Sequence, residues 1–399
     1  MSGRDPRRTS LAQFGGRVEA RGEPELSRLL AAAWRAASGP GRELTHGFHA
    51  YPARSHPRLV RRLIDALSRP GDRVVDPFCG SGTTLVEAFA SGRRALGFDV
   101  NGVAVRLARL KTRRWARTVR EELVAAAAAT ARSAAARARG REGAGPHEAP
   151  GELRGWFDAH VWRELDALGC AIERVRSPER HGALLLILSS LLTKVSRRRS
   201  ETSAAAAPKR LAPGVTARLF AARAVELAEG LAALERAAPR DTPPPIAALA
   251  DARALPVASG AVRLVVTSPP YAGTYDYSEV QALRGRLLSI PLEAAERLEI
   301  GARAAPGATI AGYRRDLAGA LREAGRILSP GGIAVVVIGD SAAAEGDVDA
   351  EALLEEAARD AGLTVAAAAS QERREGPRRA GRAAARARRQ EHLLALRRR

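Results

Sequence analysis

The chain has 399 residues, of which 46% are hydrophobic and 27% are charged, so it can form one large domain or two ordinary ones. It has no apolar run long enough to span a bilayer, and its first residues lack the apolar core of a signal peptide. Its two cysteines, Cys79 and Cys170, are too few for a disulfide framework or a zinc cluster. We therefore expect a reducing cytoplasm, no membrane partner and no metal site.

The formal net charge is +20, and nearly all of the positive charge is arginine, because the chain contains only three lysines. Arginines that neutralise phosphates release counterions, so this charge suits a polyanionic partner such as nucleic acid. The alternative is compositional drift, since the chain is rich in Ala, Arg and Gly throughout, as GC-rich coding would produce.

The first 45 residues contain one amphipathic segment, residues 24–37, which predicts a docking helix without chemistry of its own. Residues 45–58 then combine aromatic and imidazole side chains with two prolines, which indicates a stiff, extended segment. A helix is expected over residues 59–67.

A strand, a glycine turn and a helix follow. Val74 and Val75 indicate a buried strand, the turn runs from Asp76 to Gly82, and Thr83 opens an amphipathic helix. Glycines let a ligand approach the backbone, and the free amides of a helix start favour an anionic group. The pattern is neither G-x-G-x-x-G nor a P-loop, and turns of this kind also occur without a ligand.

A second strand is expected over residues 94–101, with Asp99 at its end. Because Asp99 follows the glycines by roughly 20 residues, its carboxylate could accept hydrogen bonds from the hydroxyls of an adenosine ribose. It could also cap the helix that begins near Val103.

Residues 113–245 are Ala- and Arg-rich with helical periodicity, which predicts an inserted helical subdomain. A stretch at 140–150 is expected to be flexible, and residues 183–192 read as a core helix. Basic residues follow that helix and are candidates for gripping nucleic-acid phosphates, although a solvated basic loop explains them equally well. They are Arg197, Arg198, Arg199, Lys209 and Arg210.

The chain returns to the sheet near Ala248, and a strand over residues 264–267 ends abruptly at Ser268-Pro-Pro-Tyr271. Two prolines cannot lie within a central ladder, so the strand must end there. A helix over 313–328, a strand over 333–338 and a final hairpin from residues 363–369 and 392–396 complete the expected elements. An arginine-rich loop, residues 371–389, would separate the strands of that hairpin.

The motifs at Asp76–Thr84 and Thr267–Tyr271 together resemble those of the amino-methyltransferases that use S-adenosylmethionine on DNA bases. In that family a D-P-F-x-G-S-G-T-T element holds the cofactor and an [S/D/N]-P-P-Y element holds the target amine. Both elements match here without a mismatch. Residues 45–58 resemble the segment that closes over the cofactor, although Arg54 and Ser55 depart from its usual lysine-centred string.

The resemblance implies an α/β fold with a Rossmann-like methyltransferase sheet, mostly parallel with an antiparallel last strand, and a helical insert. Its division would be a helical extension at 1–45, a methyltransferase domain at 46–112 and 246–399, and an insert at 113–245 that recognises nucleic acid. Cofactor contacts are implied for Asp76, Phe78, Gly80, Ser81, Gly82, Thr83, Asp99, Asp251 and Thr267. Catalytic roles are implied for Ser268, Pro269, Pro270 and Tyr271.

The chemistry of these residues fits methyl transfer to an exocyclic base amine. Such an amine is a poor nucleophile, so the enzyme must accept its N–H hydrogens, which the Ser268 hydroxyl and the Pro269 carbonyl could do. Tyr271 offers an aromatic face for a base turned out of its stack. Carbon-5 cytosine methylation is disfavoured, since its cysteine nucleophile would lie at the catalytic strand end, whereas Cys79 lies in the cofactor turn.

Ser268 favours cytosine N(4) over adenine N(6), because Asp is commoner at this position in the adenine enzymes. A transfer-RNA guanine amino-methyltransferase is an alternative, with RNA as partner. A nucleic-acid-binding protein that keeps the fold but has lost catalysis is another. The recognition sequence, a partner nuclease and the oligomeric state are not given by the sequence.

Overall fold

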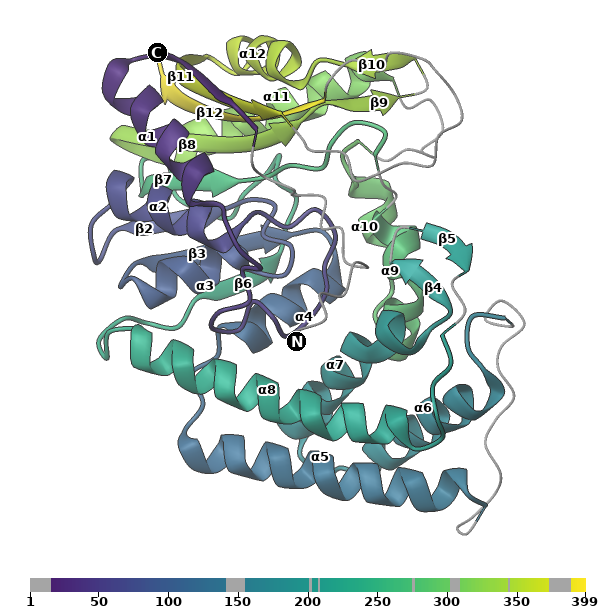
Figure 1. Cartoon of the computed structure of the whole chain (residues 1–399). Coiled ribbons are helices and arrows are strands. Elements are labelled where there is room, and N and C mark those ends of the chain that lie inside the picture. The colour runs from purple at the N-terminus through teal and green to yellow at the C-terminus, as the bar shows by residue number, and fades with distance from the viewer. Residues whose placement is uncertain are drawn as a thin grey trace.

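An eight-stranded sheet forms the centre of the protein (Figure 1). The computed structural model describes residues 16–140, 155–200, 203–206, 209–274, 277–301, 309–343, 345–372 and 389–399. In spatial order the strands of the sheet are β1 (Val18–Gly22), β11 (Leu363–Glu372), β12 (Gln390–Arg398), β8 (Leu328–Gly339), β7 (Val262–Thr267), β2 (Arg73–Asp76), β3 (Arg94–Asp99) and β6 (Ile246–Leu249).

Strand directions confirm the mostly parallel, Rossmann-like sheet. The β2 strand pairs in parallel with both β3 and β7, and parallel pairing continues to β6 on one side and to β8 on the other. The β12 strand lies antiparallel between β8 and β11, which confirms the predicted final hairpin and its reversed last strand. Parallel strands place their carboxyl ends at one edge, where ligands of open α/β sheets bind.

Helices cover both faces of the sheet because alternate strand residues point to opposite sides. Val74 packs on the face of α1 (Pro24–Ala36), α2 (Pro57–Leu67) and α3 (Thr83–Ala90). Val75 packs on the face of α11 (Ile310–Ile327) and α12 (Ala350–Asp360). The result is a three-layer arrangement in which the central strands are apolar on both sides.

A separate apolar cluster joins the helices between β3 and β6 in the chain. These helices are α4 (Gly102–Lys111), α5 (Arg117–Ala138), α6 (Ala159–Ile172), α7 (Pro178–Val195) and α8 (Val215–Ala237). Figure 1 shows α5 and α8 side by side, on the opposite side of the molecule from α12. The segment predicted as a core helix is α7, whose residues 183–192 are all buried. Among the described residues no helix is long and apolar enough to cross a membrane.

The remaining elements are short. They are a hairpin of β4 (Arg198–Ser200) and β5 (Ser203–Ala206), helices α9 (Tyr277–Leu287) and α10 (Glu293–Leu298), and a hairpin of β9 (Ser341–Ala343) and β10 (Gly346–Val348). Residues 141–150 and 373–388, which hold most of the predicted flexible stretch and of the arginine-rich loop, lie outside the described residues.

Several boundaries differ from the prediction by a few residues, and two of them have a clear cause. Helix α11 begins at Ile310 rather than 313, because the Thr309 side chain accepts a hydrogen bond from the Gly312 amide and caps it. Strand β8 begins at Leu328, not at residue 333. The Ser-Pro-Gly-Gly sequence expected only to stop the helix lies within the strand, at a register shift against β7.

A buried ionic cluster joins the last strands to the first one. His392 is 3% exposed, and its Nε2 lies 3.1 Å from Asp340 Oδ1. Its Nδ1 lies 3.3 Å from Glu351 Oε2. Arg21 of β1 donates to the other carboxylate oxygen of Glu351 at 2.7 Å. Burial opposes the charge of His392, but its hydrogen bonds to Asp340 and Glu351 outweigh that effect and raise its pKa to about 9.

Exchanging His392 for glutamine is expected to lower the free energy of unfolding by about 3 kcal/mol. The pKa of this imidazole is higher in the folded chain than the ordinary value of 6.5, so its contribution is complete below pH 6.5. The difference between wild type and H392Q should therefore shrink as the pH rises through 9. Urea unfolding at several pH values between 5.5 and 9.5 would check this, and a difference that stays constant would contradict it.

Candidate active site

The glycine turn after β2 forms one wall of a cleft. Gly80 and Gly82 have φ angles of +48° and +84°, in the left-handed region that favours glycine. A Cβ atom at Gly80 would come within 3.1 Å of the Tyr51 ring. Gly82 is the N-cap of α3 and has no side chain to cover the amides of that helix start. The turn therefore leaves backbone donors open to a ligand.

Asp99 ends β3 and braces this turn. Its Oδ2 accepts a hydrogen bond from the Gly80 amide, and its Oδ1 accepts one from the Asn101 amide, both at 2.9 Å. Each carboxylate oxygen can still accept a second bond. Burial raises the pKa of Asp99 to about 6, although the two amides oppose the shift. Asp99 thus both shapes the turn and lines the cleft.

A buried hydrogen bond connects the two sequence motifs. The Thr267 hydroxyl, at the end of β7, donates to Asp76 Oδ1 at the end of β2 with a length of 2.7 Å. The Phe78 amide donates to the same oxygen at 3.1 Å. Burial raises the pKa of Asp76 to about 6, and these hydrogen bonds work against the rise. The glycine turn and the residue before Ser268 are therefore held in fixed relation.

The Ser268–Tyr271 corner leaves the sheet directly after β7. Ser268 is half-buried, and Pro269 is buried. The Tyr313 hydroxyl, on α11, donates to the Pro270 carbonyl at 2.8 Å. Tyr271 is half-buried and packs partly against the α11 side of the core. Helix α11, which is remote in sequence, therefore fixes the Ser268–Tyr271 corner through this hydrogen bond.

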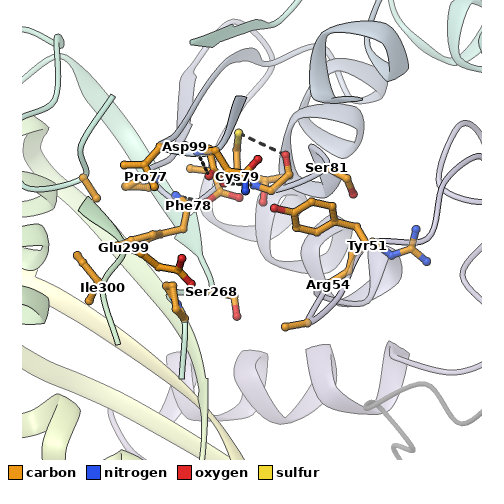
Figure 2. Close-up of a pocket in the computed structure, with 18 of the residues that line it drawn as sticks. Tyr51, Arg54, Pro77, Phe78, Cys79, Ser81, Asp99, Ser268, Glu299 and Ile300 are labelled. Carbon is orange, nitrogen blue, oxygen red and sulfur yellow. Dashed lines mark hydrogen bonds between the residues drawn. The ribbon is translucent and has the colours of Figure 1, made fainter. Parts of the chain in front are cut away.

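A cleft open to solvent is lined by residues of both motifs. Figure 2 shows Ser81 and Tyr51 on one side of it, Glu299 and Ile300 on the other, and Ser268 between them. The predicted residues that line it are Asp76, Phe78, Gly80, Ser81, Thr83, Asp99, Asp251, Ser268 and Pro270. Those not among its lining residues are Gly82, Thr267, Pro269 and Tyr271.

Asp251 follows β6 and lies at the same carboxyl edge. Its two oxygens accept hydrogen bonds from Arg253, at 2.8 Å for the shortest side-chain contact. Burial opposes the charge of Asp251, but Arg253 outweighs it and holds the pKa below its usual value. Arg253 also bonds Asp316 of α11 at 2.8 Å. The carboxylate is therefore ionised and fixed beside the cleft.

Residues 19–110 match a family model described as DNA methylase. The match runs from β1 to α4 and includes the glycine turn and Asp99, whereas the Ser268 corner lies beyond it. Curated relatives show the same kind of local similarity. The Type II methyltransferase M.MvaI of Kocuria varians is 38% identical over 74 residues, which cover 18% of this chain and 16% of the relative.

Two further relatives differ in the substrate that their names state. The DNA adenine methyltransferase YhdJ of Escherichia coli (strain K12) is 39% identical over 66 residues, 16% of this chain and 22% of the relative. The tRNA (guanine(10)-N2)-dimethyltransferase of Methanothermobacter thermautotrophicus is 40% identical over 52 residues, 13% of this chain and 16% of the relative. The chain thus spans less than a quarter of each of these three relatives.

Several residues in or beneath the cleft were not among the predicted site residues. Glu299 and Ile300 follow α10 and reach the cleft although no motif marks them. Lys111, at the end of α4, is fully buried beneath the turn and donates to the Ser81 carbonyl. Tyr51 and Arg54 belong to residues 45–58, the segment expected to close over a ligand, and both line the cleft. The expectation that this segment is extended is wrong, because it contains turns and enters α2 at Pro57.

The predicted phosphate-binding residues lie around the end of α7. Arg197 and Arg210 are exposed, and Arg197 Nε is 3.7 Å from Asp158 Oδ1. Lys209 donates to the Thr193 carbonyl at 3.0 Å. Arg198 and Arg199 are in β4, and their side chains lie outside the described part of the chain. In the described ranges, no three His, Cys, Asp or Glu side chains are grouped to hold a metal ion.

Proposed function

We propose that the protein transfers a methyl group from S-adenosylmethionine to an exocyclic amine of a DNA base, with cytosine N(4) preferred over adenine N(6). The observation that carries this proposal is the single cleft lined by both Gly80 and Ser268. The Asp76–Thr267 hydrogen bond supports it, because it fixes the two motifs relative to each other. Catalysis by alignment depends on such fixed geometry.

The residues of the cleft fit this cofactor. S-adenosylmethionine is cationic at its sulfonium and ammonium groups and carries one carboxylate. The cleft presents acidic side chains although the chain as a whole has a net charge of +20. Those acids are Asp76, Asp99, Asp251 and Glu299. The Thr83 hydroxyl is buried at the start of α3 without a hydrogen-bond partner, which leaves it to a ligand.

When bound, the cofactor supplies an electrophilic methyl group. The Ser268 hydroxyl would accept a hydrogen of the target amine, and the Pro269 carbonyl would accept another, so that the nitrogen lone pair becomes available. Tyr313 holds the Pro270 carbonyl and so keeps this corner rigid. Cys79 is no nucleophile here, because burial raises its thiol pKa well above the usual value.

The preference for cytosine is based on the resemblance at Ser268. It is not based on a distance in the structure. A hydroxyl and a carboxylate can both accept the amine hydrogen, so either base remains chemically competent. We assign binding of the DNA phosphates to Arg197 and Arg210, which are exposed near the end of α7. Replacing both with serine would then flatten the salt dependence of DNA binding.

Cofactor affinity is expected to fall as the pH drops through 6. Asp76 and Asp99 have pKa values of about 6 in the ligand-free protein, so below pH 6 they take up protons and lose the charge that attracts a cation. For each group, affinity should decrease up to about tenfold per pH unit below 6. Calorimetric titration between pH 8 and pH 5 checks this, and a pH-independent affinity would contradict it.

The deciding experiment incubates the protein with methyl-labelled S-adenosylmethionine and either DNA or transfer RNA, then identifies the labelled nucleoside by mass. The proposal expects N(4)-methylcytosine from DNA. N(6)-methyladenine would correct the target base alone. Label in transfer RNA but not in DNA would move the activity to the class of the tRNA relative. Label in neither, with DNA still retained on a gel, would indicate a binding protein.

A further inference from the structure

Lys111 is a fully buried lysine directly behind the cleft. Its side chain is 0% exposed, and its Nζ donates to the Ser81 carbonyl at 2.7 Å and to the Ser81 hydroxyl at 3.4 Å. The Thr45 hydroxyl donates to the Lys111 carbonyl at 2.9 Å and so fixes the end of α4. Ser81 lines the cleft, whereas Lys111 does not. Lys111 can therefore influence a ligand in the cleft only through Ser81.

The charge of Lys111 is not balanced by an ion pair within the described ranges. Glu87 is an acid in its neighbourhood, but the two oxygens of that carboxylate are bound by His46 at 2.6 Å and by Arg61 at 2.7 Å. Arg54 adds a second, half-buried cation that lines the cleft, and it donates to the His46 carbonyl rather than to an acid. Burial lowers the pKa of Lys111 well below its usual value, and Arg54 lowers it further, so the ammonium form is stable only with an anion close by.

Two more features make the same end of the cleft receptive to an anion. The Thr83 hydroxyl is 5% exposed, lines the cleft and has no partner. Thr83 is also the first residue of α3, where the helix dipole favours negative charge and Gly82 provides no capping side chain. An uncompensated buried cation is costly unless a ligand of opposite charge offsets it. An anionic group of the ligand would meet all of these needs.

We propose that Lys111 is a positioning residue that selects the carboxylate of the cofactor's amino-acid part, acting through Ser81. This inference rests on the proposed function, since it takes S-adenosylmethionine as the ligand. The ammonium orients the Ser81 peptide and makes the floor of the glycine turn electropositive. In the low dielectric of the interior its attraction for a carboxylate is weakly screened. The cleft thus combines this cationic support behind Ser81 with the acidic side chains of Asp99 and Glu299.

The test compares wild type with Lys111→Met by calorimetric binding of three ligands: S-adenosylmethionine, S-adenosylhomocysteine and decarboxylated S-adenosylmethionine. We expect K111M to weaken the two ligands with a carboxylate by about 10–50-fold. It should weaken the decarboxylated one by less than about threefold. Lys194→Met, at an exposed lysine near the end of α7, is the matched control and should change none of the three affinities.

Equal weakening of all three ligands would overturn the proposal, because it would show a general loosening of the turn. So would unchanged binding of all three. If K111M does not fold, as judged by circular dichroism, Lys111→Gln keeps a donor for Ser81 without the charge and is measured in the same way. Loss of fold in both variants would make Lys111 a residue of the core and also end the proposal. Failure of the wild type to bind any ligand would instead contradict the proposed function.

Discussion

Replacing Ser268 with alanine is expected to lower the rate of methyl transfer by about 10²–10³-fold, while binding of S-adenosylmethionine changes by less than about threefold. Ser268 lines the cleft directly after β7, where its hydroxyl can accept a hydrogen of the target amine. That interaction strengthens only as the amine attacks, so its loss should appear in kcat. Single-turnover kinetics at saturating cofactor measure it.

Ser259→Ala is the matched control for that prediction. Ser259 is exposed, lies before β7 at the opposite end of the strand from Ser268, and accepts a hydrogen bond from Arg326. Its replacement should leave the rate within about twofold of wild type. An unchanged rate in S268A would remove Ser268 from the catalytic role. A parallel loss of cofactor affinity in S268A would assign the residue to cofactor binding instead.

Asparagine at Asp76 is expected to weaken S-adenosylmethionine binding by about 30–100-fold without loss of the fold. The amide oxygen of asparagine can still accept the bonds from Thr267 and Phe78, so the two strands stay joined. The negative charge that attracts the cationic cofactor is lost. Calorimetric titration at pH 7.5 gives the affinity, and urea unfolding gives the stability.

The stability of D76N distinguishes a role of Asp76 in ligand binding from a structural role. The pKa of this carboxyl is raised to about 6, so its ionisation opposes folding as the pH rises from 3.8 to 6. Above pH 6, D76N should therefore be as stable as wild type or more stable, by up to about 3 kcal/mol. Asp72→Asn, just before β2 at the other end of the strand, should affect neither quantity. A D76N protein that loses stability together with affinity would contradict this prediction.

Local sequence patterns were enough to predict those elements whose structure depends mainly on neighbouring residues. Val74 and Val75 marked the central strand because both of its faces are buried, and the glycine turn marked the start of α3. Asp99 could be placed by spacing alone, since a strand and its turn have standard lengths. The final antiparallel hairpin was likewise predicted from its apolar runs.

The rest of the site could not be predicted because it depends on contacts between distant segments. Tyr313 supports the Pro270 carbonyl from 43 residues away, and neither residue signals the other. Lys111 belongs to no motif and is one of two basic residues in the last turn of α4, and only packing shows that it is buried under Ser81. Glu299 lines the cleft because the chain directly after α10 forms part of the cleft wall. Periodicity and spacing along the sequence do not indicate contacts between residues that are far apart in the chain.

The pairing of β1 with β11 has a consequence for biosynthesis. Arg21 bonds Glu351 across 330 residues of chain, and β1 takes its place at the sheet margin only beside β11. At translation rates of 5–20 residues per second, the first strand would leave the ribosome about 20–70 s before its partner. During that interval its backbone donors and acceptors have no native strand to pair with. This sheet margin can therefore close only after β11 has been synthesised.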